Sequence, residues 1–274
     1  MNDGVRPDPV KLSSDWMAVL RAREHAQPDA YLSDPCAAAF VTPAAETGVD
    51  TLGGGVLPSA VVPIRARLGD LTLLSSGVRQ AVSLGSGTDC RAYRLPLEPG
   101  VVYYEIDLPG QLTGKTERLA AAGFAPRCGV RVVEADLRRD WAPQLVTAGF
   151  SPAEPAHWIA EGLLSYLSAE RIQTLLAAVS SLAAPGSWLT FDIPHERFLR
   201  DPVFEPFLRE MGRRGVPYVG ALTDPAETLA GFGWSASAVL HRELATGGCR
   251  WLPPLPERLR TPPADVWLVR AHRP

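Results

Sequence analysis

Short apolar runs alternate with helical patterns along most of the chain. Five runs are rich in β-branched and aromatic residues, which is typical of buried strands. They cover residues 78–84, 101–106, 130–134, 157–160 and 187–193. Helical patterns fill the intervening stretches 109–122, 138–149 and 168–184, the last with Ser168 as a candidate N-cap. Because parallel strands need crossover helices, this order predicts an α/β fold with a mostly parallel sheet covered on both faces.

The two ends of the chain extend this pattern. Residues 11–40 and 58–76 have helical patterns and precede the first strand. Near the C-terminus a helix is predicted at 225–231 and strands at 234–240 and 264–271. These two strands follow one another without a clear helix between them, so antiparallel pairing is one possibility for them.

The length of 274 residues is compatible with one large domain, and we expect a single domain over 1–274. Its expected parts are a helical N-terminal cap (1–76), a cofactor-binding core (77–194), a lid or acceptor insertion (195–220) and a C-terminal helix with strands (221–274).

Composition narrows the functional class. The chain is 46% hydrophobic and 21% charged with a net charge of −3, which is typical of a soluble enzyme and argues against a nucleic-acid partner. No apolar run is long enough for a membrane span, and the N-terminus lacks an apolar signal segment. Four scattered cysteines form no metal-binding motif and suit a reducing compartment, so we expect a cytoplasmic protein without a structural metal.

The sharpest local signal is a glycine turn between an apolar strand and a helix, at Gly85 and Gly87. Glycines at such a turn let the backbone approach a ligand at the carboxyl edge of the sheet. A dinucleotide motif would continue with glycine where this chain has Cys90. Asp89 at the start of the following helix would repel phosphate. The turn therefore favours a nucleoside ligand without phosphates.

Acidic residues stand at the ends of three successive predicted strands. Asp107 is placed to accept hydrogen bonds from ribose hydroxyls, and Asp136, with Leu137 beside it, to receive an adenine amine. Glu161 ends the next strand. Each acid also has a local explanation, as a turn former, a helix cap or a solvated strand end. Together they favour a cationic nucleoside with a free diol, and S-adenosylmethionine has this chemistry.

These residues resemble the leucine carboxyl methyltransferase family, in particular its bacterial branch of natural-product S-adenosylmethionine-dependent O-methyltransferases. The similar segments are YLSDPCAAAFV (31–41), IRARLGDL (64–71), SLGSGTDCRAYRL (83–95), YYEIDLPGQLTGK (103–115), VEADL (133–137) and EGLLSYL (161–167). The resemblance implies a class I methyltransferase fold, which is Rossmann-like, with a seven-stranded mostly parallel sheet, the last strand reversed, and a helical cap.

The resemblance also implies roles for individual residues. Arg65 matches the arginine that holds the methionine carboxylate of the cofactor, and Gly85 matches the first glycine of the turn. Asp107 matches the ribose acid. Asp136 with Leu137 matches the adenine pair, and Glu161 the acid near the methionine end. An arginine near position 23 corresponds loosely to a basic cofactor contact.

Methyl transfer from a sulfonium is an in-line displacement, in which the enzyme aligns an oxygen nucleophile and excludes water. A carboxylate acceptor is already ionised, whereas a phenol or alcohol needs a base. The candidate bases are His195, after the fifth strand, and Tyr166. Aromatic residues of the insertion either line an apolar acceptor site or form the inner face of a packed helix: Phe198, Phe204, Phe207 and Tyr218.

The leading hypothesis is therefore an O-methyltransferase that acts on a small molecule or natural product, with carboxyl methylation as the first expectation and a hydroxyl as the other. Methylation of a phosphatase C-terminal leucine fits this short, arginine-rich chain less well. Two alternatives remain. One is a fold that binds the cofactor but catalyses another step, such as cyclisation. The other is a cofactor-binding scaffold without turnover.

Overall fold

The structure is a computed structural model and describes residues 9–52 and 59–274. Its centre is a seven-stranded sheet, and the strands lie in the order β3-β2-β1-β4-β5-β7-β6. Their bounds are β1 (Gln80–Leu84), β2 (Val102–Asp107), β3 (Gly129–Glu134), β4 (Ala156–Ala160), β5 (Trp188–Pro194), β6 (Ser235–Leu240) and β7 (Val266–His272). The expected mostly parallel seven-stranded sheet is confirmed.

The sheet reverses its strand order beside β1. The first five strands pair in parallel, and β1 lies between β2 and β4. β7 runs antiparallel to both β5 and β6, which confirms antiparallel pairing of the last two strands. A short helix that the sequence pattern did not predict, α10 (His241–Thr246), separates them in the chain. The carboxyl ends of β1 and β4, on either side of this switch point, are where an open α/β sheet forms its binding crevice.

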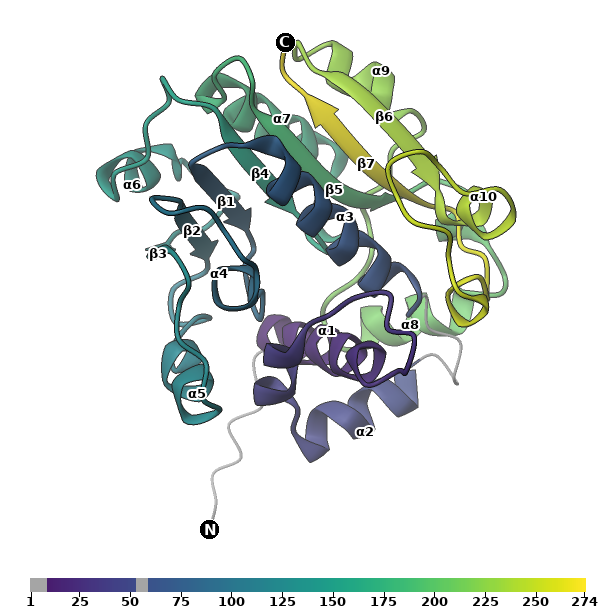
Figure 1. Cartoon of the computed structure of the whole chain (residues 1–274). Helices are drawn as coiled ribbons and strands as arrows, with labels where there is room; N and C mark the ends of the chain where they lie inside the picture. The colour runs from purple at the N-terminus through teal and green to yellow at the C-terminus, as the bar shows by residue number, and fades with distance from the viewer. Residues whose placement is uncertain (1–8, 53–58) are drawn as a thin grey trace.

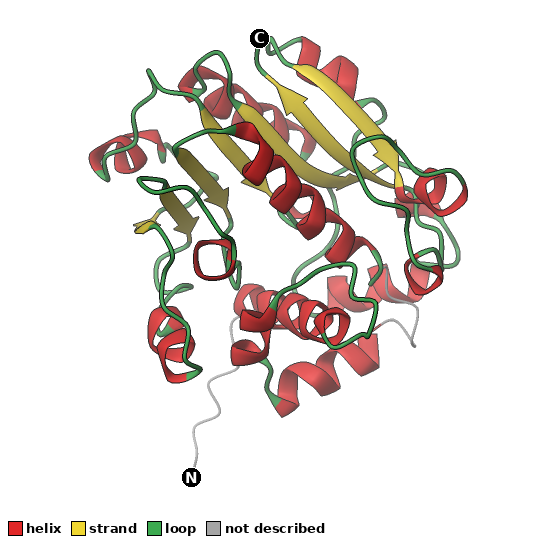
Figure 2. Cartoon of the chain, in the orientation of Figure 1, coloured by secondary structure: helices red, strands yellow, loops and turns green. Residues whose placement is uncertain are grey.

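Helices cover both faces of the sheet (Figure 1, Figure 2). One apolar core joins the sheet to α6 (Ala142–Thr147), α7 (Ala169–Leu182) and α9 (Pro225–Ala230). The other face packs against α3 (Val61–Ser76), α4 (Arg91–Arg94) and α5 (Lys115–Ala121). Strand residues alternate between these cores, as a two-faced sheet requires: Val82 and Leu84 face one, and Ala81 the other.

The remaining helices gather beyond the carboxyl ends of the parallel strands, at the lower side of Figure 1. They are α1 (Pro9–His25), the 3-10 helix η1 (Pro35–Phe40), α2 (Pro43–Thr51) and α8 (Glu205–Arg213). Trp16 of α1, Val49 of α2 and Phe207 of α8 belong to one buried cluster. The chain therefore folds its N-terminal helices and its insertion over the same end of the sheet.

Several predicted helices are shorter in the structure. The 11–40 pattern divides because α1 ends at His25, and Asp34 caps the separate η1, whose first residue is Pro35. The 109–122 pattern becomes helical only at Lys115, because Gly110 and Gly114 adopt positive φ in the preceding turns. The 138–149 pattern becomes helical only at Ala142. Ser168 caps α7 as predicted, and its side chain accepts from the Arg171 N–H.

The structure differs in one respect from the helical cap that we expect over residues 1–76. Helix α3, which falls in that range, lies against β4, β5 and β7, so it belongs to a layer of the sheet and not to the cap. Residues 1–8 and 53–58 of the same range lie outside the described residues. Among the helices that the structure describes, none is long and apolar enough to cross a bilayer.

The Phe150 ring links α6 to the sheet and provides a test of this core. It packs edge-on against Trp158 of β4 and Tyr104 of β2, at centroid distances of 5.1 and 5.7 Å. We expect Phe150→Ala to lower the free energy of unfolding by about 3–5 kcal/mol, because it removes a buried ring and leaves a cavity. The nearby Val146→Ala, at a side chain that is 45% exposed, should change it by about 0.5 kcal/mol or less. Urea denaturation of both variants measures the difference, and equal losses would contradict this packing.

Candidate functional site

A cavity of about 350 Å³ opens at the carboxyl ends of β1, β2 and β4. This volume lies within the usual range of small-molecule sites. Its floor is the glycine turn after β1, and its walls come from α1, α3 and the segment after α8. The cavity brings together all seven residues predicted to bind the cofactor, and one of the two candidate bases: Arg65, Gly85, Gly87, Asp107, Asp136, Leu137, Glu161 and Tyr166.

The glycine turn is held by its neighbours. Gly85 and Gly87 have φ angles of 67° and 44°, a region that L side chains rarely adopt. The N–H groups of Gly85 and Ser86 donate to the Ile106 carbonyl of β2. A Cβ at Gly87 would overlap the Ser14 side chain of α1. Gly87 therefore allows α1 to approach the turn, a constraint that the sequence motif alone does not reveal.

Asp107 at the end of β2 is buried and orders the turn. Its Oδ2 accepts from the Gly87 N–H at 2.7 Å, and its Oδ1 accepts from the Leu108 N–H at 2.8 Å. The carboxylate thus stands beside the turn at the cavity wall, where the sequence analysis places a ribose acid. Nearby, the Ser86 hydroxyl is buried and has no hydrogen-bond partner among the described residues. Such a group at a cavity wall is a natural contact for a bound ligand.

Asp136 lies further along the cavity, after β3. Both of its oxygens are engaged by the Arg138 guanidinium, at 2.8 and 2.9 Å, and by the Arg138 N–H. The hydrogen-bonded Arg138 side chain lowers the pKa of Asp136, so this carboxylate is ionised at neutral pH. Leu137 packs against the main apolar core. The arginine clamp on Asp136 is a feature that the sequence analysis missed.

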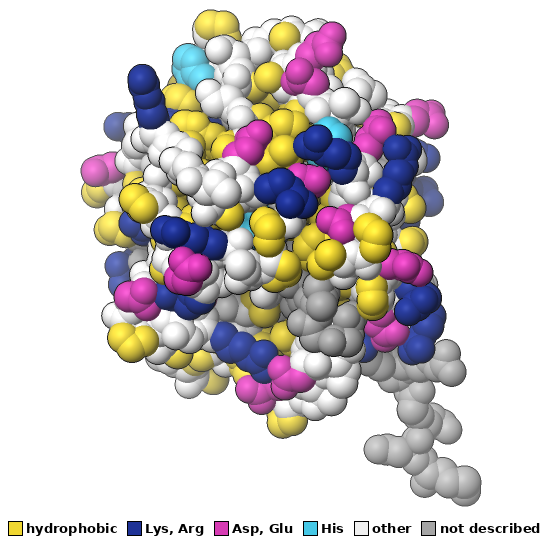
Figure 3. All heavy atoms as spheres, turned by 90° about the vertical axis from the view of Figure 1, so that its right-hand side faces the viewer, with side chains coloured by type: hydrophobic (Ala, Val, Ile, Leu, Met, Phe, Trp, Pro, Cys, Tyr) yellow, Lys and Arg dark blue, Asp and Glu magenta, His cyan; other side chains and the backbone are white. Residues whose placement is uncertain are grey.

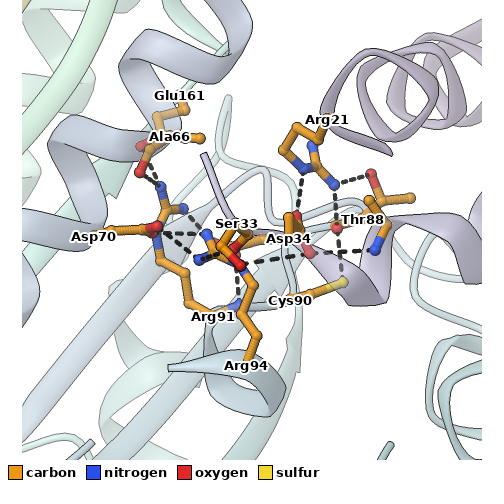
Figure 4. A network of polar contacts seen from close by, with 12 residues as sticks. Arg21, Ser33, Asp34, Ala66, Asp70, Thr88, Cys90, Arg91, Arg94 and Glu161 are labelled. Atoms are coloured by element: carbon orange, nitrogen blue, oxygen red, sulfur yellow. Dashed lines mark hydrogen bonds and ion pairs between the residues drawn. The ribbon is translucent and has the colours of Figure 1, made fainter. Parts of the chain in front are cut away.

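Arg91 connects Glu161 to the rest of the site (Figure 4). Its guanidinium donates to Glu161 at 2.7 Å, and to Asp70 and Asp89 at 2.9 Å each. A fourth bond reaches the Ala66 carbonyl of α3. Burial acts to lower the pKa of Arg91, but the surrounding carboxylates raise it well above its usual range, so it stays charged. Arg91 therefore ties the glycine turn, α3 and the end of β4 together.

The arginine of the N-terminal segment that lines the cavity is Arg21, whereas Arg23 is not among the described residues of its wall. Arg21 is buried, donates to Asp34 at 2.8 Å, and reaches the Thr88 carbonyl of the glycine turn at 2.6 Å (Figure 4). Arg23 is two residues further along α1, about 200° around the helix axis, and pairs with the exposed Asp50. Helical periodicity places the two arginines on different faces, and packing shows that Arg21 is on the inner one.

Lys115 is also at the cavity, and it is buried. Its Nζ pairs with Glu105 of β2 at 2.7 Å, and both side chains are 4% exposed or less. A lysine at the start of a helix is usually exposed, so the sequence pattern gives no sign of this burial. The turns before α5 bring this lysine back over the sheet, because the helix starts at Lys115 itself.

Arg65 stands where the main cavity meets a second, smaller one. Its Nη1 donates to Asp192 of β5 at 2.8 Å, and the side chain is 9% exposed. The other oxygen of Asp192 accepts from the Gly162 N–H at 2.7 Å. The residues that line both cavities are Met17, Val62, Arg65, Tyr166 and Tyr218.

Tyr166 and Tyr218 form a pair at this junction, with ring centroids 5.1 Å apart and an edge-to-face arrangement. Burial raises the pKa of Tyr166 well above its usual range, and burial also raises the pKa of Tyr218. Both phenols are therefore neutral hydrogen-bond donors at physiological pH. The structure thus favours Tyr166 as a donor over the general-base role predicted from its position.

The other candidate base, His195, is not among the described residues that line either cavity. Its N–H donates to the Asp265 carbonyl, and its Nδ1 accepts from the Arg197 N–H at 3.0 Å. The ring packs against Trp267 of β7. The end of β5 turns towards β7, so a residue that follows a parallel strand does not automatically face the crevice.

Most arginines away from the site form ion pairs. On the face shown in Figure 3, Lys and Arg side chains are interspersed with acidic ones. Arg242 pairs with Asp265 at 2.9 Å and Arg258 with Glu24 at 2.6 Å. Such pairs neutralise opposite charges locally, and the face shown in Figure 3 has no broad patch of one sign.

Comparison with known proteins agrees with the site. The leucine carboxyl methyltransferase family matches residues 15–180. A protein of Parafrankia, named "Putative S-adenosyl-L-methionine-dependent methyltransferase", is 41% identical over 192 residues, which cover 66% of this chain and 61% of that protein. A protein of the same name from Saccharopolyspora erythraea is 37% identical over 280 residues, and the alignment covers 96% of each chain.

Solved structures agree on the fold. A DUF574 family protein from Streptomyces avermitilis superposes with a TM-score of 0.62 at 15% identity, over 97% of this chain and 100% of that one. A protein from Thermobifida fusca that is named as a methyltransferase superposes with a TM-score of 0.56 at 17% identity, over 98% of this chain and 99% of that one. The fold is that of the class I methyltransferases. Within that class, the chain belongs to the leucine carboxyl methyltransferase family.

The buried Glu161 provides a test of the site's electrostatics. Burial raises the pKa of Glu161 to about 7, although Arg91 acts to lower it. In the unfolded chain the Glu161 carboxyl ionises near its usual pKa. The protonated carboxyl therefore stabilises the native state in full below about pH 4.5, and this stabilisation is lost as the pH rises through 7. Glu161→Gln removes the titration. The free energy of unfolding of this variant, relative to wild type, should therefore increase by roughly 1–3 kcal/mol from pH 5 to pH 8.

Urea denaturation of the ligand-free proteins across this pH range measures that difference. Glu117→Gln, at an exposed position of α5, is the matched control and should follow the wild-type profile. A constant difference between Glu161→Gln and wild type would contradict the raised pKa.

Proposed function

We propose that this protein is an S-adenosylmethionine-dependent O-methyltransferase that methylates a carboxylate of a small-molecule acceptor. The names of its relatives support S-adenosylmethionine as the methyl donor, and the residues at the cavity support a carboxylate as the acceptor. The observation that carries the proposal is the junction of the two cavities, where one guanidinium and two neutral phenols converge. Such a donor set stabilises a bound anion.

The cavity suits a cationic nucleoside. Asp107 at the glycine turn is placed for the ribose hydroxyls, and the unpartnered Ser86 hydroxyl is a further contact. Asp136 and Leu137 would receive the adenine, with Arg138 holding the carboxylate in position. Glu161, fixed by Arg91, would accept from the ammonium. A bound cation next to Glu161 would favour its ionised form.

Arg65 and α1 complete the part of the main cavity that would hold the methionine group of the cofactor. Arg65 binds Asp192 through Nη1, so the rest of the guanidinium keeps donors for the methionine carboxylate. Arg21 and Ser14 hold α1 against Thr88 of the turn. The helix thereby closes the cavity over the ligand and limits the access of water, which such a displacement requires.

When bound, S-adenosylmethionine supplies an electrophilic methyl group. The chain's own part is to align the acceptor and to exclude water. Tyr166 and Tyr218 hydrogen-bond to each other, and the O–H that this pair has left would donate to one oxygen of the acceptor carboxylate and leave the other free to attack. No proton has to be removed, because a carboxylate is ionised at neutral pH. The neutral state of both tyrosines fits this role.

A hydroxyl acceptor is the second candidate, and one observation favours it. The Glu161 carboxyl lies at the cavity, and its raised pKa of about 7 lets it accept a proton near neutral pH. The methylated product distinguishes the candidates, because a carboxyl ester is hydrolysed by mild base whereas an ether is not.

The reaction is tested with labelled S-adenosylmethionine and a panel of small carboxylic acids, each paired with the alcohol that has the same carbon skeleton. We expect label to enter a product of the acids and to be released as methanol by mild base. Label in a base-stable product of the alcohols would instead support the hydroxyl acceptor. Transfer to neither member of any pair would contradict both candidates.

Cofactor binding is tested separately, by calorimetric titration with S-adenosylhomocysteine. Asp107→Asn should weaken binding roughly 10- to 100-fold, because it removes charge-assisted hydrogen bonds at the turn. Asp50→Asn is a matched control at a side chain that is 61% exposed and should bind like wild type. Circular dichroism verifies that both variants are folded. Unchanged binding by folded Asp107→Asn would exclude the ribose role of Asp107.

A further inference from the structure

The second cavity is small, largely apolar and closed by the insertion after β5. Its volume is about 30 Å³. Apolar side chains from α1, α8 and β7, and Leu52 just after α2, contribute to its wall: Trp16, Leu20, Leu52, Phe207, Met211 and Val266. Residues of this wall belong to the buried cluster that joins the cap to the insertion. The cavity therefore lies inside the packed core of the cap, behind the Tyr166–Tyr218 pair.

The volume limits what this cavity can hold. A water-sized group needs about 10–15 Å³ by the same measure, so the space takes roughly two or three carbon-sized groups. A longer chain or an aromatic ring would have to displace buried side chains, and overpacking of that kind is unfavourable.

Two polar side chains of the wall differ in their hydrogen bonding: the Trp16 indole Nε1 is buried without a hydrogen-bond partner among the described residues, and the Asp192 carboxylate is fully engaged. Asp192, the acidic residue of this wall, is neutralised by Arg65 and accepts from the Gly162 N–H. At the junction with the main cavity, the donor that faces an acceptor comes from the hydrogen-bonded Tyr166–Tyr218 pair, and Arg65 lies beside it. The arrangement is a polar mouth with an apolar end, which matches an amphiphile with an anionic head and a short aliphatic tail.

We propose that the acceptor is a short-chain aliphatic monocarboxylic acid, whose tail of about two or three carbons occupies the second cavity and whose carboxylate lies at the tyrosine pair. This inference rests on the proposed function for its chemistry, and on the second cavity for the size of the tail. Phe207 and Met211 of α8 are the residues that set the length limit, because they form its wall from the insertion side.

A substitution at Phe207 tests the length limit more directly than one at Met211. Its ring packs edge-on against Tyr218, at a centroid distance of 5.3 Å, and is 2% exposed. Phe207→Ala therefore enlarges the cavity directly behind the carboxylate position. Met211→Ala enlarges the same cavity without removing a ring contact of Tyr218, and serves as a second variant if Phe207→Ala folds poorly.

Phe204 is the matched control. It is as buried as Phe207 and packs against Phe198 at 4.7 Å, but it is not among the described residues that line either cavity. Phe204→Ala removes the same atoms from the same cluster. Any general loosening of the insertion should appear in this variant as well.

The experiment measures the affinity of acetate, propionate, butyrate, hexanoate and phenylacetate by calorimetric titration, with S-adenosylhomocysteine saturating the cofactor site. This readout needs no turnover. In the wild type, affinity should rise up to about fourfold per methylene from acetate to butyrate, and fall for hexanoate and phenylacetate. Phe207→Ala or Met211→Ala should move the optimum to the longer acids, whereas Phe204→Ala should keep the wild-type order.

A flat profile, a preference of the wild type for the largest acids, or an equal change in Phe204→Ala would overturn the inference. Labelled S-adenosylmethionine then separates it from the proposed function. Acids that bind with this length optimum but receive no label would retain the tail site and contradict carboxyl methylation. Base-labile label on large acids only would retain carboxyl methylation and contradict the tail site.

Discussion

The site depends on one buried charge, the guanidinium of Arg91. It binds three carboxylates and a backbone carbonyl that come from the glycine turn, α3 and the end of β4. A buried cation without such partners would be strongly unfavourable, so these segments are tied to one arrangement. The same constraint extends outward through Asp70, which also binds Arg94. The cofactor turn is therefore positioned by a network that lies beneath it.

The acidic residues of this network have two different roles. Asp70 and Asp34 are saturated by arginines and hold segments together. Asp107 and Glu161 stand at the cavity wall, where they keep the turn in place and present oxygens to a ligand. Arg65 and the tyrosine pair line the junction with the second cavity, close to Glu161. The site thus has acceptors along the edge of the sheet and donors at the junction.

Prediction from the sequence succeeded where a residue's position follows from its place on a strand. Asp107, Asp136 and Glu161 reach one cavity because parallel strands end at the same edge of a sheet. It was less informative where position depends on how a segment packs. His195 follows β5 but packs against Trp267 of β7, and Lys115 starts a helix whose preceding turns bury it over the sheet. Arg21 and Arg23 are equally basic and two residues apart, and the buried contacts of Arg21 with Asp34 and Thr88 distinguish them.

The sequence by itself determined the alternation of strands and helices, the glycine turn, the line of strand-end acids and the family. These are properties of local patterns, because side-chain periodicity and backbone freedom act over a few residues. Only the tertiary structure decided which charges pair inside the protein, that Tyr166 and Tyr218 meet at the junction, and that a small apolar cavity lies behind them. Burial and long-range contact set these properties, and both arise from segments far apart in the chain.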